Sequence, residues 1–226
     1  MELVNAIKTR KSIRDFKTDP VPRKVIKEIL TTAVLAPSGV NRQPWEFAVI
    51  TGHLLDKIKE ANVQRLYSSG SSLGKTSTLP PDSPYLKRQV DLARELFRLM
   101  DIEREDKEKR RIWMERGFRY FNAPAVIILL SDKSLPAEQV QLEIGGLMQT
   151  ICLMALEYDL GTCIEGQGVA FPEILYEMLE IPEKKRIIMA IAIGYPNWDF
   201  PANNIETPRE AVENITLWEG FKENTS

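Results

Sequence analysis

The stretch "APAVIILLS" at residues 123–131 constrains the fold more than any other part of the chain. Apolar residues occupy both the odd and the even positions of this stretch, and these positions point to opposite faces of a strand. A strand there must therefore be covered on both of its faces. A second apolar run, "RIIMAIAIGY" at 186–195, predicts another buried strand. Helical patterns alternate with these runs and provide the covering layers. The order of elements indicates an α/β or α+β fold.

The spacing of apolar residues predicts the other elements. Helices are expected over 2–10, 22–36, from Leu54 onward, and over 86–100, 103–120, 136–159 and 172–180. Strands are expected over 46–51, 123–131, 162–165 and 186–195. A segment rich in Ser, Gly and Pro, at 64–84, predicts a loop. No repeat and no linker divides the 226 residues, so we expect a single domain, 1–226.

The composition excludes several classes of protein. Thirty basic residues nearly balance 32 acidic ones, which argues against nucleic acid as a partner. No apolar run has the length of a membrane span, and the first residues lack a secretory pattern, so we expect a cytoplasmic protein without a membrane partner. Two cysteines and one histidine argue against a disulfide scaffold and against a metal site.

Three short motifs resemble known sites but lack the context that those sites need. "GSSLG" at 70–74 fits a serine-hydrolase pattern, but the only histidine, His53, precedes it and no strand leads into it. "GSSLGKT" at 70–76 is one residue too short for a phosphate-binding P-loop. "GQG" at 166–168 lacks the third glycine of a dinucleotide fingerprint. We assign none of these functions to them.

The basic stretch "KTRKSIRDFK" at 8–17 is a candidate anion-binding segment. Arg10, Ser12 and Arg14 are spaced two apart, so an extended segment would place their side chains on one face. Two guanidiniums and a hydroxyl can clamp a phosphate, and Lys11 adds positive charge. A solvated helix end is the alternative interpretation.

The connection "LAPSGVNRQPWEF" at 35–47 joins a predicted helix to a predicted strand and is unusually rich in polar and rigid residues. The amides of Asn41 and Gln43 each offer a donor and an acceptor, which suits a ring edge that alternates C=O and N–H groups, such as a flavin pyrimidine. Pro37 and Pro44 stiffen the loop around them. The tryptophan of this stretch fits either the core or the floor of a site.

The helix predicted over 136–159 contains "EIGGLMQTICLMAL", which is apolar around most of its circumference. Such a helix has to be buried on most sides. Burial within one chain and burial against a partner subunit both satisfy this requirement. Gly145 and Gly146 would allow a second helix backbone to approach closely.

Four motifs together resemble the nitroreductase family of flavin enzymes in their order and spacing. They are "TRKSIRDF", "APSGVNRQPWEF", "LGTCIEGQG" and "AIAIGYP", and the resemblance covers 3–51 and 123–210. It implies an α+β fold of the nitroreductase type, with a mostly antiparallel sheet flanked by helices, in an intertwined homodimer. The region of about 64–120 would be a helical, lid-like insertion that covers the flavin and shapes the substrate pocket.

The resemblance also implies FMN as the cofactor, in two sites at the dimer interface. The cofactor-binding residues implied on one subunit are Arg10, Lys11, Ser12, Arg14, Glu165, Gly166 and Arg209. Those implied on the other subunit are Pro37, Ser38, Asn41 and Gln43. Main-chain N–H groups of Glu165 and Gly166 would face flavin N5 and the neighbouring carbonyl oxygen, where a donor stabilises developing charge.

The implied activity is that of an NAD(P)H-dependent oxidoreductase, with flavin N5 and no catalytic side chain carrying the reaction. A small-molecule electron acceptor, either a nitroaromatic, a quinone or a similar conjugated electrophile, would be reduced by a ping-pong mechanism. Two alternatives stay open at this point. One is a flavin enzyme of the same fold that performs reductive dehalogenation or ene reduction, and the other is a non-catalytic flavin-binding dimer. The sequence does not choose between NADH and NADPH.

Overall fold

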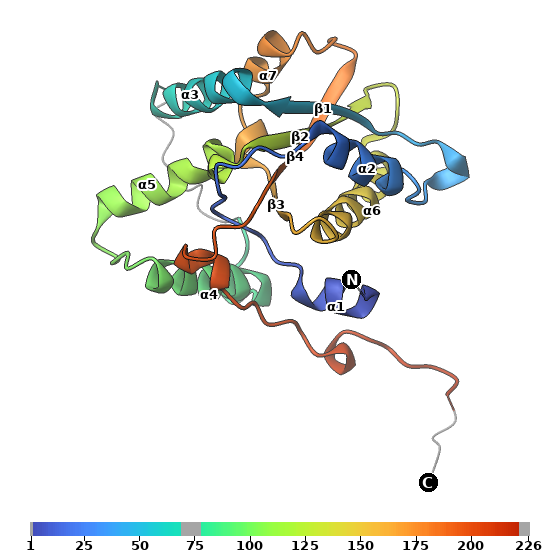
Figure 1. Ribbon diagram of the computed structural model, residues 1–226. Helices are drawn as coiled ribbons and strands as arrows, with labels where there is room; N and C mark the ends of the chain where they lie inside the picture. The colour runs from blue at the N-terminus through green and yellow to red at the C-terminus, as the bar shows by residue number, and fades with distance from the viewer. Residues whose placement is uncertain (1, 69–77, 222–226) are drawn as a thin grey trace.

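A computed structural model describes residues 2–68 and 78–221, and it is built around one four-stranded sheet (Figure 1). The strands are β1 (Glu46–Thr51), β2 (Ala125–Asp132), β3 (Gly161–Glu165) and β4 (Lys185–Gly194). Their order is β1-β2-β4-β3, and every pairing between them is antiparallel. This confirms the α+β class.

Helices cover both faces of the sheet, as the doubly apolar strands require. In β2, Ile127 and Leu129 pack on one side with α2 and α6, while Ile128 and Leu130 pack on the other with α3. The helices are α1 (Leu3–Thr9), α2 (Arg23–Ala33), α3 (Gly52–Ser68), α4 (Pro84–Leu99), α5 (Lys107–Phe118), α6 (Ala137–Leu156) and α7 (Pro172–Met178). The alternation of side chains along β2 therefore divides the core into two layers.

Two boundaries differ from the sequence-based prediction. The helix expected from Leu54 begins at Gly52 and continues to Ser68, so residues 64–68 are helical and not part of a loop. Leu66 explains the extension, since it is buried against Val63 and Phe118 and stabilises a further turn. The motifs at 70–74 and 70–76 lie outside the described residues. Of the predicted loop, residues 78–83 are described, and they form neither helix nor strand.

The insertion that was expected over about 64–120 contains α4 and α5. These helices pack on the segment after β4, where Leu96 of α4 is buried with Ala202 and Ile205. After α5 the chain turns sharply through Tyr120, Phe121 and Asn122, all of which have positive φ angles of 52°, 53° and 60°. Left-handed backbone at bulky residues is unfavourable by about 1–2 kcal/mol each, so the surrounding packing must hold this turn in place.

The C-terminal tail exposes several apolar side chains. The tail runs away from the body of the molecule past α4 and α1 (Figure 1). Its exposed apolar residues are Val212, Ile215, Leu217, Trp218 and Phe221. In the described parts of the chain, no helix combines the length and the apolar character that crossing a membrane requires.

Candidate functional site

The basic segment near the N-terminus is extended, as predicted, and is held at both ends. Ser12 forms a parallel bridge with Thr162 of β3, and Phe16 forms an antiparallel bridge with Pro196. The N–H of Ile13 donates to the carbonyl of Thr162 at 2.9 Å, and the buried Ile13 side chain anchors the segment in the core. The extended segment continues from α1 and lies beside the outer strand of the sheet.

Arg14 is the cation that this arrangement holds most firmly. Its main-chain N–H donates to Oδ1 of Asn203 at 2.6 Å, and its guanidinium donates to the carbonyl of Ser12 at 3.2 Å. Burial lowers the pKa of the guanidinium, an effect that Cys163 partly offsets. Among the residues that the structure describes, no carboxylate lies within salt-bridge distance of Arg14. A partly buried cation without a counterion is a favourable partner for an anionic or electron-rich ligand.

Arg10 and Lys11 lie close to Arg14 in sequence but line a hollow to which Arg14 does not contribute. This cavity of about 300 Å³ also has Asp159, Gly161 and Trp198 in its wall. The structure thus brings Ser12 and Arg14 into contact, whereas Arg10 and Lys11 face this cavity.

The loop that carries Asn41 and Gln43 is strained and well anchored. Val40, Asn41 and Gln43 have positive φ angles of 49°, 58° and 49°. Ser38 Oγ accepts from the N–H of Gln43 at 3.0 Å, and Oε1 of Glu143 in α6 accepts from the N–H of Gly39 at 2.8 Å. Such strain at exposed polar residues is frequent at ligand sites. These two hydrogen bonds anchor the loop that Pro37 and Pro44 are expected to stiffen.

The loop and the basic segment lie apart within one chain. In Figure 1 the loop projects beyond α2 and β1, while residues 10–17 run from α1 toward the opposite side. The amides of Asn41 and Gln43 are exposed, as is Pro37. Arg209 is also separate, since its guanidinium donates to Thr207 and Pro208 in its own exposed segment. One chain alone thus brings together only some of the predicted cofactor-binding residues.

The turn after β3 is open at Gly166. A side chain built on Gly166 would meet only Sδ of Met189, at 3.9 Å, so a flat ligand has room to approach. Glycine at 168 has a different role, because a side chain there would overlap the ring of Tyr120. The Tyr120 hydroxyl donates to the Gly168 carbonyl at 2.7 Å and fixes the end of the turn.

The side chain of Glu165 points into the protein and is 8% exposed. Its Oε2 accepts from the N–H of Gly168 at 2.8 Å, while its Oε1 is buried without a hydrogen-bond partner among the described residues. Burial raises the pKa of this carboxyl to about 7, although the N–H groups of Gly168 and Gln167 oppose the rise. Burial also raises the pKa of the neighbouring Tyr120 hydroxyl, so the tyrosine stays neutral.

Sequence reasoning missed the residues that support the site from behind. Asn203 is fully buried and, besides holding Arg14, donates to the carbonyls of Asp15 and Asn197 at 2.8 and 2.7 Å. Arg116 of α5 donates to the Arg14 carbonyl at 2.8 Å and to Asp15 at 2.5 Å. The only available signal for the first was its position in the stretch "NNIETPRE". Arg116 sits among many charged residues of α5, where nothing distinguishes it.

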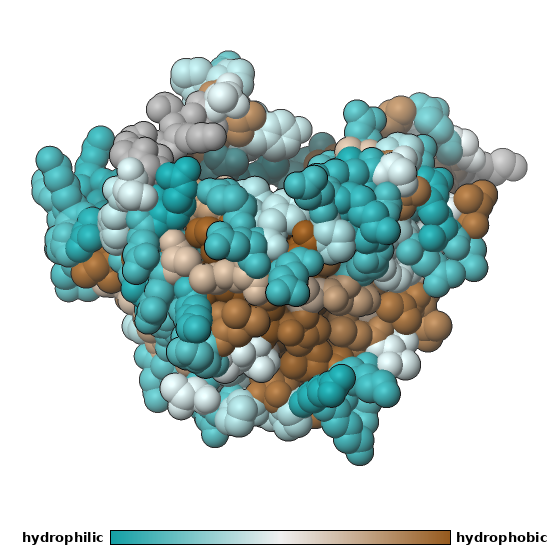
Figure 2. All heavy atoms as spheres, turned by 90° about the horizontal axis from the view of Figure 1, so that it is seen from above, coloured by the Kyte–Doolittle hydropathy of each residue, from teal (hydrophilic) through white to brown (hydrophobic). Residues whose placement is uncertain are grey.

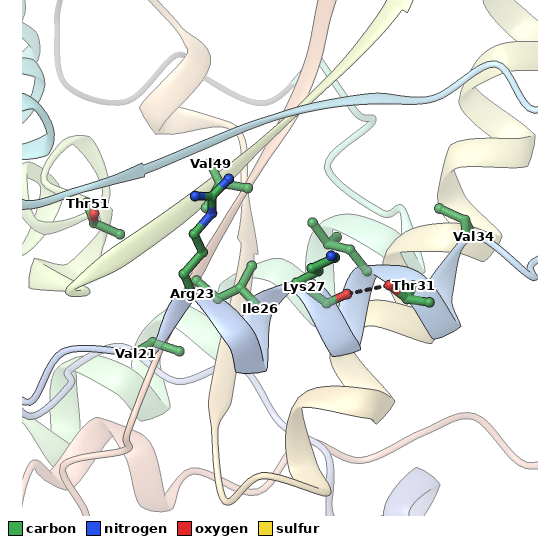
Figure 3. A pocket seen from close by; sticks show the side chains of 9 residues that line it. Val21, Arg23, Ile26, Lys27, Thr31, Val34, Val49 and Thr51 are labelled. Atoms are coloured by element: carbon green, nitrogen blue, oxygen red, sulfur yellow. Dashed lines mark hydrogen bonds between the residues drawn. The ribbon is translucent and has the colours of Figure 1, made fainter.

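A second hollow, larger than the one lined by Arg10 and Lys11, belongs to another part of the surface. A groove of about 780 Å³ runs between α2 and the edge strand β1, and Val21, Ile26, Lys27, Val34 and Val49 point toward it (Figure 3). Figure 2 shows apolar side chains gathered in one area of the face seen from above, bordered by hydrophilic ones. The basic segment does not line this groove, so the groove is no part of the candidate site.

The combined geometry suits a flat ligand with an anionic end. Arg14, and Arg10 from the cavity side, provide positive charge, and the Gly166 turn leaves room beside main-chain donors. Within the described residues, no cluster of three His, Cys, Asp or Glu side chains is arranged to hold a metal ion.

Comparisons with known proteins find relatives that match most of this chain. A model of the Nitroreductase family matches residues 7–195. The chain is 28% identical to the 4-nitrobenzoate reductase of Pseudomonas putida over 217 residues, which covers 95% of this chain and 94% of that protein. It is 29% identical to the nitrobenzene nitroreductase of Ectopseudomonas oleovorans over 215 residues, covering 94% of each.

A solved structure confirms the predicted nitroreductase-type fold. The FMN and NADPH-dependent nitroreductase NfnB from Sphigopyxis sp. strain HMH superposes with a TM-score of 0.90 at 24% identity. The superposition covers 98% of this chain and 100% of the other.

The buried carboxyl gives a first prediction, which concerns Glu165→Gln. In the folded protein the Glu165 carboxyl has a pKa of about 7, whereas its ordinary value is 4.5. Wild-type stability relative to the variant should therefore fall as pH rises between these values, by about 3 kcal/mol in all, and stay level above them. Urea unfolding of the cofactor-free protein at a series of pH values measures this. The exposed carboxylate Glu173, changed to Gln, serves as the control, and a pH-independent difference for Glu165→Gln would contradict the prediction.

Proposed function

This chain belongs to the nitroreductase family, and we propose that it is an FMN-dependent oxidoreductase that reduces small conjugated electrophiles with electrons from NAD(P)H. The observation that carries the proposal is the partly buried Arg14 guanidinium, which has no carboxylate partner among the described residues. It interacts with Cys163 of β3, the strand that leads into the open turn at Gly166. An unpaired cation in such a place is unfavourable without a ligand of opposite charge. FMN supplies both the anionic group and the flat ring.

FMN fits the chain's own residues at two places, the basic segment and the turn after β3. Ser12 and Arg14, with Arg10 and Lys11 beside them, hold the phosphate and ribityl chain. The main-chain N–H groups of Glu165 and Gly166 face the ring, where the absent side chain of Gly166 leaves space. When bound, FMN carries electrons from the nicotinamide to the acceptor. The protein orients both reactants and shields the site, so no side-chain acid or base is needed.

Donor and acceptor use the same face of the site in turn, which gives ping-pong kinetics. Helices α4 and α5 form a lid that closes over this face and shapes the acceptor pocket. Nitroaromatics, quinones and similar electrophiles are the acceptors. The relatives named as nitrobenzene and 4-nitrobenzoate reductases support nitroaromatics over the dehalogenation and ene-reduction alternatives. A cytoplasmic location remains a prediction.

The protein functions as a homodimer with its cofactor sites at the interface. Apolar side chains exposed on the single chain support this, among them Leu3 and Val4 of α1, which are 65% and 63% exposed, and Leu142 of α6, which is 81% exposed. A side chain at Gly146 would meet nothing within 4 Å, so this side of α6 is free to receive a second helix. The separation of the Asn41 loop from the Arg14 segment in one chain is resolved if each site takes the loop from the other subunit.

The activity test uses purified protein reconstituted with FMN. We expect a yellow protein that oxidises NADH or NADPH only when 4-nitrobenzoate, nitrobenzene or a quinone is added under anaerobic conditions. Initial rates at several concentrations of both substrates should give parallel double-reciprocal lines. Mass spectrometry of the released cofactor should identify FMN, and a protein that takes up FAD or no flavin would contradict the proposal.

Replacing Arg14 with Ala should weaken FMN binding while the fold remains. A hydrogen bond to a charged group contributes about 1.5–3 kcal/mol, which corresponds to a roughly 10- to 150-fold loss of affinity. Quenching of flavin fluorescence during titration of the cofactor-free protein gives the dissociation constant. Lys17→Ala removes an exposed charge of the same segment and should leave the affinity unchanged. Equal affinities for Arg14→Ala and wild type would mean that Arg14 does not touch the cofactor.

Mixed dimers test whether each site is shared between two chains. One variant loses the basic residues (Arg10→Ala with Arg14→Ala) and the other loses the loop contacts (Ser38→Ala with Asn41→Ala). Each homodimer should bind FMN poorly. In a heterodimer one site collects all four substitutions and the other has none, so isolated, differently tagged heterodimers should regain about one FMN per dimer. Heterodimers as empty as both parents would place the whole site within one chain.

A further inference from the structure

The turn that follows β3 rests on a cluster of buried polar side chains that no step of the proposed reaction uses. Glu165, Tyr120 and Asn62 come from β3, from the turn after α5 and from α3. Asn62 is fully buried, and its Nδ2 donates to the carbonyl of Phe118 at 3.2 Å and approaches the Tyr120 hydroxyl at 3.5 Å. The cluster therefore ties the insertion to the turn that presents its main-chain N–H groups to the ring.

Two acceptor atoms of this cluster have no hydrogen-bond partner among the described residues. They are Oε1 of Glu165 and Oδ1 of Asn62, both buried. A carboxylate in this position would leave charge on an unsolvated oxygen, whereas a carboxylic acid would not. The other oxygen of Glu165 accepts the N–H of Gly168, so the side chain also closes the turn.

Glu165 is the member of the cluster whose charge can change near neutral pH. Burial raises the pKa of its carboxyl to about 7. Burial also raises the pKa of Tyr120, and it raises that of Cys163 to about 12, so both of these neighbours stay neutral. Arg14, beyond Cys163, stays cationic. Strand β4 pairs Ala190 with Glu165 and adds no charge, and α3 contributes the uncharged Asn62.

We propose that Glu165 is a positioning residue that also sets the redox behaviour of the site: its side chain holds the turn at the flavin ring, and its ionisation lowers the reduction potential of the bound flavin. The inference rests on the proposed function, because it needs FMN beside the turn. A negative charge buried near the ring disfavours the added electrons, and a low-dielectric interior screens this effect weakly. Because the coupling is reciprocal, reduction of the flavin must in turn favour the protonated carboxyl.

The first measurement compares the midpoint potentials of FMN-loaded wild type and Glu165→Gln in anaerobic dye titrations between about pH 5.5 and about pH 8.5. The two potentials should coincide at the acidic end, where both side chains are neutral. Above neutral pH the wild-type potential should fall below that of the variant, by a gap that widens and then levels off. Glu115→Gln is the control. Burial acts to raise the pKa of the Glu115 carboxyl, but hydrogen bonds with Tyr67 and Arg119 outweigh it and lower the pKa, so this carboxylate stays ionised. Its offset from wild type should be the same at every pH. Parallel profiles for wild type and Glu165→Gln would overturn the proposal.

A second measurement needs no variant and decides the matter if Glu165→Gln does not fold. Burial raises the pKa of the Glu165 carboxyl to about 7, so an infrared band of a protonated carboxylic acid above about pH 5.5 reports on it. The band should disappear toward about pH 8.5, and it should persist to higher pH when the flavin is reduced. Equal titrations in the oxidised and reduced protein would refute the coupling.

The cofactor-free protein separates this proposal from the function on which it rests. If the protein binds no FMN, the proposed function fails, and the coupling fails with it, while the infrared titration of the free protein still shows whether Glu165 holds a proton. If FMN binds and NAD(P)H is oxidised but the potentials run parallel, only the role of Glu165 is refuted.

Discussion

The docking of the extended basic segment against the end of the sheet decides where every other part of the site can lie. Ile13 is joined to Thr162 by a main-chain hydrogen bond of 2.9 Å, and Lys17 is joined to Tyr195 by one of 2.8 Å. The approach is possible because residue 161 is glycine, where any side chain would overlap Ile13. The cations of this segment, the turn after β3 and the supports behind them are all fixed relative to one another through this contact.

Two arginines at this segment, Arg14 and Arg116, differ in whether a carboxylate pairs with them, and this difference distinguishes a structural charge from one that can bind a ligand. Arg116 is paired with Asp15, and its guanidinium lies 4.3 Å from the centre of the Phe200 ring, so its charge is used within the protein. Arg14 has no such carboxylate among the described residues, although its main chain is held just as firmly. Because Asp15 is already occupied by Arg116 and Asn197, it does not neutralise the neighbouring guanidinium. The acidic residue next to the cation therefore strengthens the frame without competing for the ligand.

The sequence predicted the layers of the fold and the type of its site, but not the residues that support the site. The runs that became β2 and β4 are apolar at both odd and even positions, so neither face of these strands is polar. This predicted that helices cover the sheet on both sides. The motif spacing indicated Arg14 and the Gly166 turn. It could not indicate Asn203, which contacts Arg14 but lies 189 positions further along the chain. It also predicted a stiff loop at 37–44 from its prolines, but it predicted neither the left-handed backbone at Val40 nor the hydrogen bond from Gly39 to Glu143 of α6, which joins residues 104 positions apart.

The order β1-β2-β4-β3 also sets a sequence in time. No two paired strands of the described sheet form a hairpin: 73 residues (52–124) separate β1 from β2, 52 residues (133–184) separate β2 from β4, and 19 residues (166–184), which include α7, separate β3 from β4. Helices can form from local contacts as soon as they emerge, but pairings this distant close slowly. At a synthesis rate of ~5–20 residues per second, β4 is complete roughly 3–12 s after β2. During that interval the most apolar strand of the chain has only edge strand β1 to pair with, and its other edge stays open. The nascent chain is therefore most exposed to aggregation between the synthesis of its two central strands.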